Sequence, residues 1–223
     1  MPPSTSSLPI VVLISGRGSN LQSLLDGWRH GELPIELRAV ISNRPDATGL
    51  ERAQSAGVPA ILVDHTRFPD RDAFDAALLQ AIDAFEPKLV VLAGFMRRLT
   101  APFCDHYSGR MLNIHPSLLP AYQGLRTHDR ALADGVREHG ATVHFVTQDL
   151  DGGPPVLQAV VPVRPTDDAT TLAARVLEQE HRILRCAVRW FAQGRLRMQE
   201  GAAYLDGQRL NKPLRLQADA LCP

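Results

Sequence analysis

Long apolar runs, a net charge and a cysteine framework are all missing from this sequence of 223 residues. No apolar run approaches the roughly 18 residues that a membrane-spanning helix needs. Lysine plus arginine total 24, as do aspartate plus glutamate, so the formal net charge is zero. This balance argues against bulk electrostatic binding to nucleic acid or to an anionic membrane, although it leaves room for a local anion pocket.

Several chemical signatures are also missing. The three cysteines, Cys104, Cys186 and Cys222, form neither a CxxC pair nor an even-numbered framework, which predicts reduced thiols in a cytoplasmic protein. No cluster of histidine, cysteine or carboxylate residues has metal-ligand spacing, so we expect no metal. The absence of a Gly-x-Ser-x-Gly elbow weighs against a serine hydrolase.

The composition that is present, 44% hydrophobic and 22% charged residues, is typical of a globular protein with a real core. Residues 1–8 are rich in proline and serine and lack both a basic stretch and an apolar stretch, so we expect a disordered tail and no signal peptide. We expect a single domain over residues 9–212 and a loose tail over residues 213–223.

Predicted strands alternate with predicted helices along the chain. Apolar, β-branched runs predict strands, and apolar residues repeating every three or four positions predict helices. The predicted strands cover 10–14, 36–41, 60–63, 89–93, 111–115, 141–146 and 156–163. The predicted helices cover 21–28, 50–56, 70–85, 126–134 and 170–193, and an Asp-Gly pair at 206–207 predicts a hairpin. This alternation predicts an α/β, Rossmann-like fold with a twisted, mostly parallel sheet, mixed in its second half, and helices on both faces.

A glycine-rich run, Ser-Gly-Arg-Gly-Ser-Asn at 15–20, separates the first predicted strand from the first helix. The free N–H groups of a helix N-terminus could face an anion such as a phosphate there. The run matches neither GxGxxG nor a Walker A loop. The alternative interpretation is a plain turn with Ser19 or Asn20 as the N-cap.

The segment 111–120 carries the strongest chemical signal. Asn113 and His115 lie two residues apart in a predicted strand, so both side chains point to the same face. Pro116 ends the strand, and the carboxyl end of a strand is where open α/β sheets bind ligands. The third candidate is Asp151, in the turn-rich loop 148–154, although it could equally be a simple turn former.

An amide, an imidazole and a carboxylate suit acyl transfer without a covalent intermediate. Asn113 and protonated His115 could donate hydrogen bonds to the acyl oxygen. Asp151 could stabilise the imidazolium and help to move the proton that an attacking amine loses. For two further histidines the default interpretations are structural: a surface position for His128 and a satisfied position in the sheet for His144.

Four stretches in this order resemble the phosphoribosylglycinamide formyltransferases, within the wider folate-dependent formyltransferase superfamily. They are residues 14–22, 91–97, 113–120 and 150–154. The resemblance extends from residue 9 to about residue 210. It implies a cytoplasmic transferase of purine biosynthesis that moves the formyl group of 10-formyltetrahydrofolate to the amine of 5'-phosphoribosylglycinamide, the glycinamide ribonucleotide.

The resemblance also implies roles for individual residues. His115 would be the general acid, Asn113 would hold the formyl oxygen, and Asp151 would assist His115. The ribonucleotide contacts would be Gly18, Ser19, Asn20 and Glu180. The folate contacts would be Arg71, Met96, Arg97, Arg98, Leu99, Asn113, Thr147, Gln148, Asp149 and Leu150.

The same resemblance divides the domain into a ribonucleotide-binding half at 9–108 and a catalytic, folate-binding half at 109–212. It also implies a cis peptide before Pro120. Three positions depart from the family pattern: Leu177 stands where a polar residue is expected, Gln123 replaces an often-seen proline, and Arg126 occupies a variable site. The implied partners are the two small-molecule substrates, with no nucleic acid and no membrane, for a monomer or weak homodimer.

Three alternatives stay open. A methionyl-tRNA formyltransferase shares the Asn-x-His pattern but would need a basic C-terminal domain for tRNA. A formyltetrahydrofolate hydrolase would use the same donor and usually carries an extra N-terminal regulatory domain. A Rossmann-like dinucleotide-binding module or nucleotide sensor would need an acidic residue after the second predicted strand, where Ser42 and Asn43 stand instead.

Overall fold

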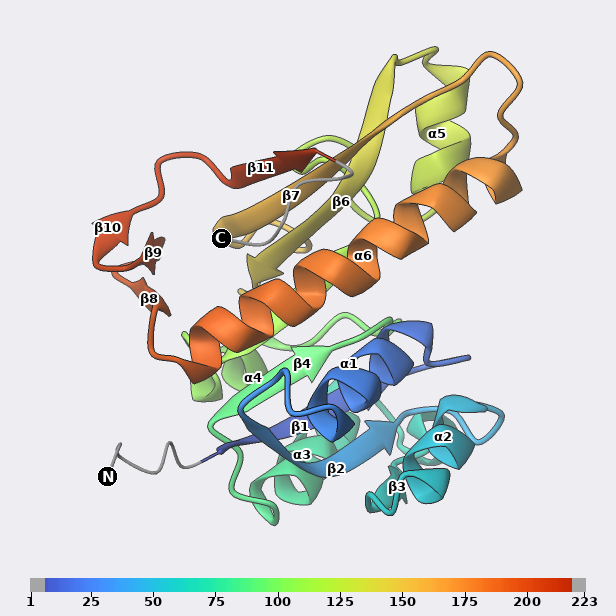
Figure 1. Ribbon diagram of the computed structural model, residues 1–223. Helices are drawn as coiled ribbons and strands as arrows, with labels where there is room; N and C mark the ends of the chain where they lie inside the picture. The colour runs from blue at the N-terminus through green and yellow to red at the C-terminus, as the bar shows by residue number, and fades with distance from the viewer. Residues whose placement is uncertain (1–6, 218–223) are drawn as a thin grey trace.

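The computed structural model describes residues 7–217, which form an α/β fold around one eight-stranded sheet (Figure 1). The sheet order is β11-β7-β6-β5-β4-β1-β2-β3. Its strands are β1 (Leu8–Ile14), β2 (Ile35–Ser42), β3 (Ala60–Leu62), β4 (Leu89–Leu92), β5 (Met111–His115), β6 (Glu138–Phe145), β7 (Pro155–Pro162) and β11 (Leu214–Gln217). The predicted fold class is therefore confirmed.

The two ends of the sheet differ in strand direction. Strands β1 to β5 run parallel to one another, whereas β6 is antiparallel to both β5 and β7. The sheet is mixed in its second half, as predicted. Parallel strands need a crossover, and helices supply it in the first half. The two antiparallel connections of the second half differ: residues 116–137, between β5 and β6, include α5, whereas a loop of residues 146–154 joins β6 to β7.

Helices cover both faces of the sheet (Figure 1). They are α1 (Ser19–Arg29), α2 (Gly49–Ser55), α3 (Arg71–Asp83), α4 (Ala101–His106), α5 (Thr127–Ala133) and α6 (Ala169–Ala192), with a short 3-10 helix, η1 (His65–Arg67). Helices α1, α2 and α6 contribute to the apolar core on one face, and α3 and α4 contribute to the core on the other. The sides of β1 alternate accordingly: Ile10, Val12 and Ile14 face the first core, while Val11 and Leu13 face the second.

A second, three-stranded sheet follows α6. It contains β8 (Leu196–Gln199), β9 (Ala202–Leu205) and β10 (Gln208–Arg209). The predicted Asp-Gly hairpin is confirmed, because β9 and β10 are antiparallel on either side of that turn. Neither β8 nor the six-residue helix α4 was predicted. Both elements are too short to show a clear period in the sequence.

Both predicted tail boundaries are wrong. Leu8, assigned to the disordered tail, begins β1, and its N–H donates to the carbonyl of Pro34 at 2.9 Å. Residues 214–217, assigned to the loose C-terminal tail, form β11, which pairs in parallel with β7. That pairing joins residues 57 positions apart, such as Leu157 and Leu214, so local sequence gave no sign of it. The other residues of these tails, 1–6 and 218–223, lie outside the described residues.

The prediction of three reduced cysteines holds only in part. Cys104 is a free, buried thiol, and burial raises its pKa to about 11. Cys186 is disulfide-bonded, which contradicts the prediction. Cys222 lies outside the described residues.

The sheet has a topological switch point beside β1. The chain passes from β1 to β2 and β3 on one side, then returns to β4 on the other side. The loops that follow β1 and β4 therefore leave the sheet in different directions, and the crevice between them is the usual ligand site of such folds. The carboxyl end of β5, with Asn113 and His115, lies next to β4 at this same edge.

Candidate active site

Strand β5 and the loop after β6 bring the three predicted catalytic residues together. His115 Nδ1 lies 3.5 Å from Asp151 Oδ2, and the two side chains are only 8% and 9% exposed. The backbone N–H of Gly124 donates to the same carboxylate oxygen at 2.8 Å. Asp151 is therefore more than a turn former: its carboxylate is buried against the imidazole of His115, 36 positions away.

The loop after β5 fixes the orientation of His115. The ring Nε2 lies 2.9 Å from the carbonyl oxygen of Tyr122, so Nε2 carries a hydrogen and donates to it. Nδ1 is then the nitrogen that faces Asp151. The loop also contains the cis peptide Leu119–Pro120, as the resemblance implied.

His144 also belongs to the site, although the sequence predicted only a structural position for it in the sheet. It is buried as expected, but its position opposite Asn113 on the antiparallel strand β6 places its ring in the site. Asn113 Nδ2 donates to His144 Nε2 at 3.1 Å, and His144 Nδ1 donates to the carbonyl of Phe145 at 2.8 Å. His144 Nε2 also lies 3.8 Å from Asp151 Oδ1.

These contacts require a neutral His144. Burial lowers the pKa of His144 to about 4, so the ring is uncharged at neutral pH and Nε2 can accept the hydrogen bond from Asn113. Only the register between β5 and β6 brings Asn113 and His144 together, so the spacing in the sequence could not reveal the contact.

The Asp151 loop has a backbone that the local sequence only partly explains. Asp151 adopts a left-handed conformation with φ 51°, which is strained for a residue that is not glycine. A side chain at Gly153 would overlap the carbonyl oxygen of Phe145, so only glycine allows this close approach. Gln123 Nε2 donates to the Asp151 carbonyl at 3.3 Å, so this departure from the family pattern contacts the Asp151 loop.

A cleft opens beside Asn113, His144 and Asp151. Its walls come from the loop after β4 and the loop after β6. Most of the predicted folate contacts line it, together with three apolar residues of the floor. The lining residues are Leu92, Phe95, Arg97, Arg98, Leu99, Asn113, His144, Val146, Thr147, Gln148, Asp149, Leu150 and Asp151.

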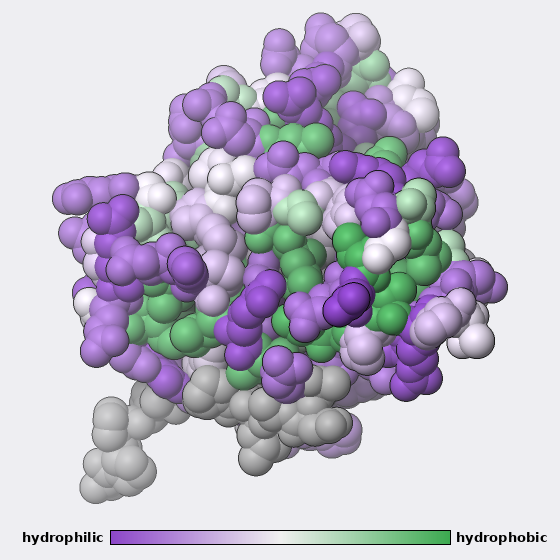
Figure 2. Space-filling view, turned by 90° about the horizontal axis from the view of Figure 1, so that it is seen from above, coloured by the Kyte–Doolittle hydropathy of each residue, from purple (hydrophilic) through white to green (hydrophobic). Residues whose placement is uncertain are grey.

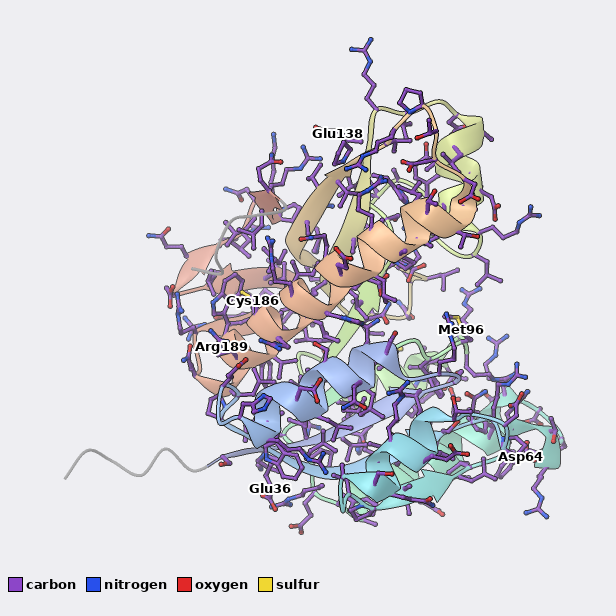
Figure 3. All side chains as sticks on the ribbon, turned by 45° about the vertical axis from the view of Figure 1, so that its right-hand side comes forward. Glu36, Asp64, Met96, Glu138, Cys186 and Arg189 are labelled. Atoms are coloured by element: carbon purple, nitrogen blue, oxygen red, sulfur yellow. The ribbon has the colours of Figure 1, made fainter. Side chains whose placement is uncertain are left out.

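Two predicted folate residues lie outside this cleft. Arg71, the first residue of α3, lines an adjoining cavity that shares Arg98, Leu99, Gln148 and Asp149 with the cleft. Met96 is 64% exposed and lies at the edge of the molecule, where the ribbon of the first half meets that of the second (Figure 3).

Apolar side chains are exposed around the cleft. Among the described residues, the large hydrophobic side chains that stay exposed are Leu62, Met96, Leu125 and Leu150. Three of these four belong to the loops beside the site, and Leu150 lines the cleft itself. Seen from above, in Figure 2, apolar surface is broken into patches by hydrophilic residues. Exposed apolar residues at a cleft mark a surface suited to an aromatic or apolar ligand.

A buried carboxylate supports the β4 side of the cleft. Asp75 is only 2% exposed, and its Oδ2 accepts the N–H of Thr100 at 2.7 Å. Burial raises the pKa of Asp75, against the lowering effect of that hydrogen bond and of Arg71 and Arg97. The sequence does not single out Asp75, because the position of this residue in α3 falls on the helix face that packs on the sheet.

The glycine-rich run forms the second candidate binding region. Gly18 is the N-cap of α1, with φ 69°, and a side chain there would lie 2.9 Å from the Cα of Gly49. No side-chain hydrogen bond caps this helix, so neither Ser19 nor Asn20 serves as the N-cap. The first N–H groups of α1 are therefore available to an anion.

Helix α6 places Glu180 beside the glycine-rich run. Asn20 Nδ2 donates to Glu180 Oε2 at 2.7 Å. Burial raises the pKa of Glu180, and Asn20 Oδ1 is buried without a hydrogen-bond partner in the structure. The contact brings together residues 160 positions apart and leaves polar atoms ready for hydroxyl or amide groups of a ligand.

His128 is not the simple surface residue that was expected. It is half-buried, and its Nδ1 lies 3.2 Å from Nε2 of the fully buried His139. Burial lowers the pKa of His139 to about 4 and also lowers the pKa of His128. The pair lies beneath the loop that carries Tyr122, whose ring packs edge-on against His139.

No group of three or more histidine, cysteine or carboxylate side chains among residues 7–217 could hold a metal ion. In the same part of the chain, no helix combines the length and the apolar character needed to cross a membrane.

Comparisons with known proteins identify similar sequences and structures. Residues 8–188 match the family model described as formyl transferase. The phosphoribosylglycinamide formyltransferase of Escherichia coli is 54% identical over 201 residues, which cover 90% of this chain and 95% of that protein. A solved structure of the phosphoribosylglycinamide formyltransferase of Coxiella burnetii is 53% identical, with a TM-score of 0.89, and the match covers 94% of this chain and 99% of that one.

A more distant structure bears on one of the alternatives. A formyltetrahydrofolate deformylase from Pseudomonas syringae is 27% identical, with a TM-score of 0.82. The match covers 89% of this chain but only 66% of that chain.

Proposed function

The chain belongs to the formyl transferase family, and from that premise we propose how its residues transfer a formyl group from 10-formyltetrahydrofolate to the amine of 5'-phosphoribosylglycinamide. Transfer of a formyl group from a formyl-folate is the activity of the family, and the relatives of highest identity among those described act in purine biosynthesis. The observation that carries the residue roles is that Asn113 and Asp151 line the cleft while His115 Nδ1 lies 3.5 Å from Asp151 Oδ2.

The folate donor occupies the cleft between the loops after β4 and β6. The apolar floor, which includes Leu92, Phe95 and Val146, suits the aromatic part of a folate. Arg97 and Arg98 suit its carboxylates. Arg71 extends this basic surface outward through the adjoining cavity. Met96, exposed next to Arg97, is a further proposed folate contact.

The ribonucleotide occupies the region between the glycine-rich run and α6. The N–H groups of Gly18, Ser19 and Asn20 bind its phosphate, since the helix dipole and the free donors both favour an anion. Glu180 and Asn20 contact the ribose side of the ligand. Because Leu177 stands where the family pattern has a polar residue, we assign the polar contacts from α6 to Glu180.

The chemistry is direct attack of the amine on the formyl carbon. As the new C–N bond forms, negative charge grows on the formyl oxygen, and the Asn113 amide together with the His115 imidazolium donates hydrogen bonds to it. The His115 Nδ1–Asp151 distance of 3.5 Å is longer than a strong hydrogen bond, so this N–H can be shared with a substrate oxygen.

Asp151 stabilises the imidazolium and receives, through water, the proton lost by the amine. Its carboxylate stays in place because Gly124 N–H holds one oxygen. His144 is a positioning residue in this scheme: it fixes the Asn113 amide through its neutral Nε2. His115 supplies a proton as the bond to the folate nitrogen breaks, so the tetrahydrofolate leaves as a neutral amine.

An absorbance assay of folate deformylation, run with and without the ribonucleotide, tests this function. We expect deformylation to depend on the ribonucleotide and to continue fully with a chelator present, since no residue in the scheme is a metal ligand. Deformylation by water alone would instead support the hydrolase that the Pseudomonas syringae relative represents. Complete inhibition by the chelator would contradict the mechanism.

We also propose that the enzyme acts in the cytoplasm as a monomer or weak homodimer, with the two small molecules as its substrates and without nucleic acid or membrane partners. Each substrate has a region in this one chain, since Glu180 and Asn20 meet within it and so do His115 and Asp151. Sedimentation velocity at micromolar concentration tests the oligomeric state, and a stable higher oligomer would contradict it.

A further inference from the structure

A buried serine connects the two candidate ligand regions. Ser15 is the residue directly after β1 and is 7% exposed. Its backbone N–H donates to the carbonyl of Gly94 at 3.1 Å, and its hydroxyl oxygen accepts the N–H of Met96 at 2.7 Å. The loop after β4 is thus hydrogen-bonded twice to this single residue.

The hydroxyl of Ser15 also donates a hydrogen bond to the residue that follows β2. It donates to Oδ1 of Asn43 at 2.5 Å, and Asn43 is only 1% exposed. The backbone carbonyl of Asn43 accepts a hydrogen bond from His65 Nδ1 at 2.8 Å. The hydroxyl therefore has one donor and one acceptor contact, and both partners are held by surrounding structure.

Under the proposed function, the two loops that meet at Ser15 bind different substrates. Gly18 to Asn20, in the same turn as Ser15, would bind the phosphate of the ribonucleotide. Met96 is followed directly by Arg97 and Arg98, which line the folate cleft. The Ser15 hydroxyl lies between the two loops at the switch point of the sheet, with no flexible side chain separating them.

We propose that Ser15 is a positioning residue that couples the binding of the two substrates. This inference rests on the proposed function. Phosphate binding orders the turn that begins at Ser15, and the hydroxyl then holds the N–H of Met96 in the place that the folate wall requires. By thermodynamic linkage, the folate must strengthen ribonucleotide binding by the same factor.

The size of the coupling follows from one buried hydrogen bond. Such a bond contributes an amount that corresponds to about a 3- to 10-fold change in an equilibrium constant. The folate affinity of the wild-type enzyme should therefore rise by about that factor when the ribonucleotide saturates its site. Chemistry at the formyl carbon uses other residues, so kcat should change less than the binding constants.

Calorimetric titration with 5,8-dideazafolate, a folate analogue without a transferable formyl group, measures the coupling. The dissociation constant is determined without and with saturating glycinamide ribonucleotide, for the wild type and for Ser15→Ala. We expect the ratio of the two constants to be about 3 to 10 in the wild type and close to 1 in Ser15→Ala. Ser15→Thr, which keeps the hydroxyl, should restore part of the ratio.

Ser23→Ala is the matched control. Ser23 is equally buried, lies on α1 and donates its hydroxyl to the carbonyl of His181, away from the folate wall. Its removal costs a similar buried hydrogen bond, so the variant should keep the wild-type ratio. If the ratio of the two dissociation constants is close to 1 in both variants, any loosening near α1 abolishes the coupling. That result would overturn the role of Ser15.

Other outcomes separate this inference from the proposed function. A wild-type ratio of 1, with both ligands binding, would overturn the coupling and leave the proposed function intact. Failure of either ligand to bind the wild type would contradict the proposed function itself. If Ser15→Ala does not fold, hydrogen exchange of residues 94–99 in the wild type decides: saturating ribonucleotide alone should slow their exchange, and unchanged exchange would refute the coupling.

Discussion

The two proposed ligand regions of this protein are built in different ways. The proposed ribonucleotide region is mainly backbone: a short turn after β1 and the first N–H groups of α1. The proposed catalytic region is mainly side chain: Asn113 and His115 from β5, His144 from β6 and Asp151 from the loop beyond it. A backbone site is encoded by consecutive residues, whereas a side-chain site depends on the register between strands.

This difference predicts which region tolerates substitution. In the catalytic region, a single side-chain change should remove chemistry and leave the fold intact. In the ribonucleotide region, no single side chain carries the phosphate, so only a change of backbone conformation should weaken binding strongly.

The largest effect is expected for the catalytic region. His115→Ala and Asp151→Asn should each lower kcat by at least about 100-fold, which is the usual contribution of general acid–base catalysis. Asp151→Asn keeps an oxygen for the Gly124 N–H, so the loop should remain in place. Steady-state kinetics measures the loss, circular dichroism checks the fold, and Asp105→Asn, at an exposed position on α4, is the control. A near-wild-type rate in either variant would remove that residue from the mechanism.

A smaller but selective effect is expected for the ribonucleotide region. Gly18→Ala forces a side chain into a left-handed backbone and against Gly49, so the turn must shift. We expect the KM for the ribonucleotide to rise by about 10-fold, with little change in the affinity of the free enzyme for folate. Gly31→Ala shares the positive φ but meets no atom within 4 Å, so it controls for strain alone. Equal effects of the two variants would argue against a phosphate site at Gly18.

The catalytic half should also make the fold sensitive to acid. Burial lowers the pKa of both His144 and His139 to about 4, whereas an unfolded chain binds these protons near 6.5. The unfolded state then holds more protons between these pH values, so the free energy of unfolding should decrease as the pH falls from about 6.5 to about 4. Urea titrations at several pH values measure this. The slope should become shallower in His139→Gln, and an unchanged slope would exclude His139 as a contributor.

The smallest effect is expected at the departure from the family pattern beside Asp151. Gln123→Ala removes the 3.3 Å hydrogen bond to the Asp151 carbonyl, but this contact is exposed and long. We therefore expect kcat/KM to change by less than about 3-fold. A loss comparable to that of Asp151→Asn would show that Gln123 helps to hold the catalytic loop.

The sequence was sufficient for much of this architecture. Alternating apolar runs predicted most of the strands and helices, and the spacing of Asn113 and His115 placed both at the carboxyl end of one strand. The same reasoning left Asp151 uncertain and set the C-terminal boundary too early, at residue 212. Both points depend on contacts between distant parts of the chain: Asp151 with the loop after β5, and β11 with β7.

By itself, the sequence determined the elements, the glycine-rich turn and the residue types available for chemistry, because each follows from interactions within a few positions. Only the tertiary structure decided that His144 fixes Asn113, that Asp75 holds the loop after β4 and that Ser15 joins two loops. These contacts span 25 to 81 positions. They form only after the strands have paired in one register, and no local period in the sequence records that register.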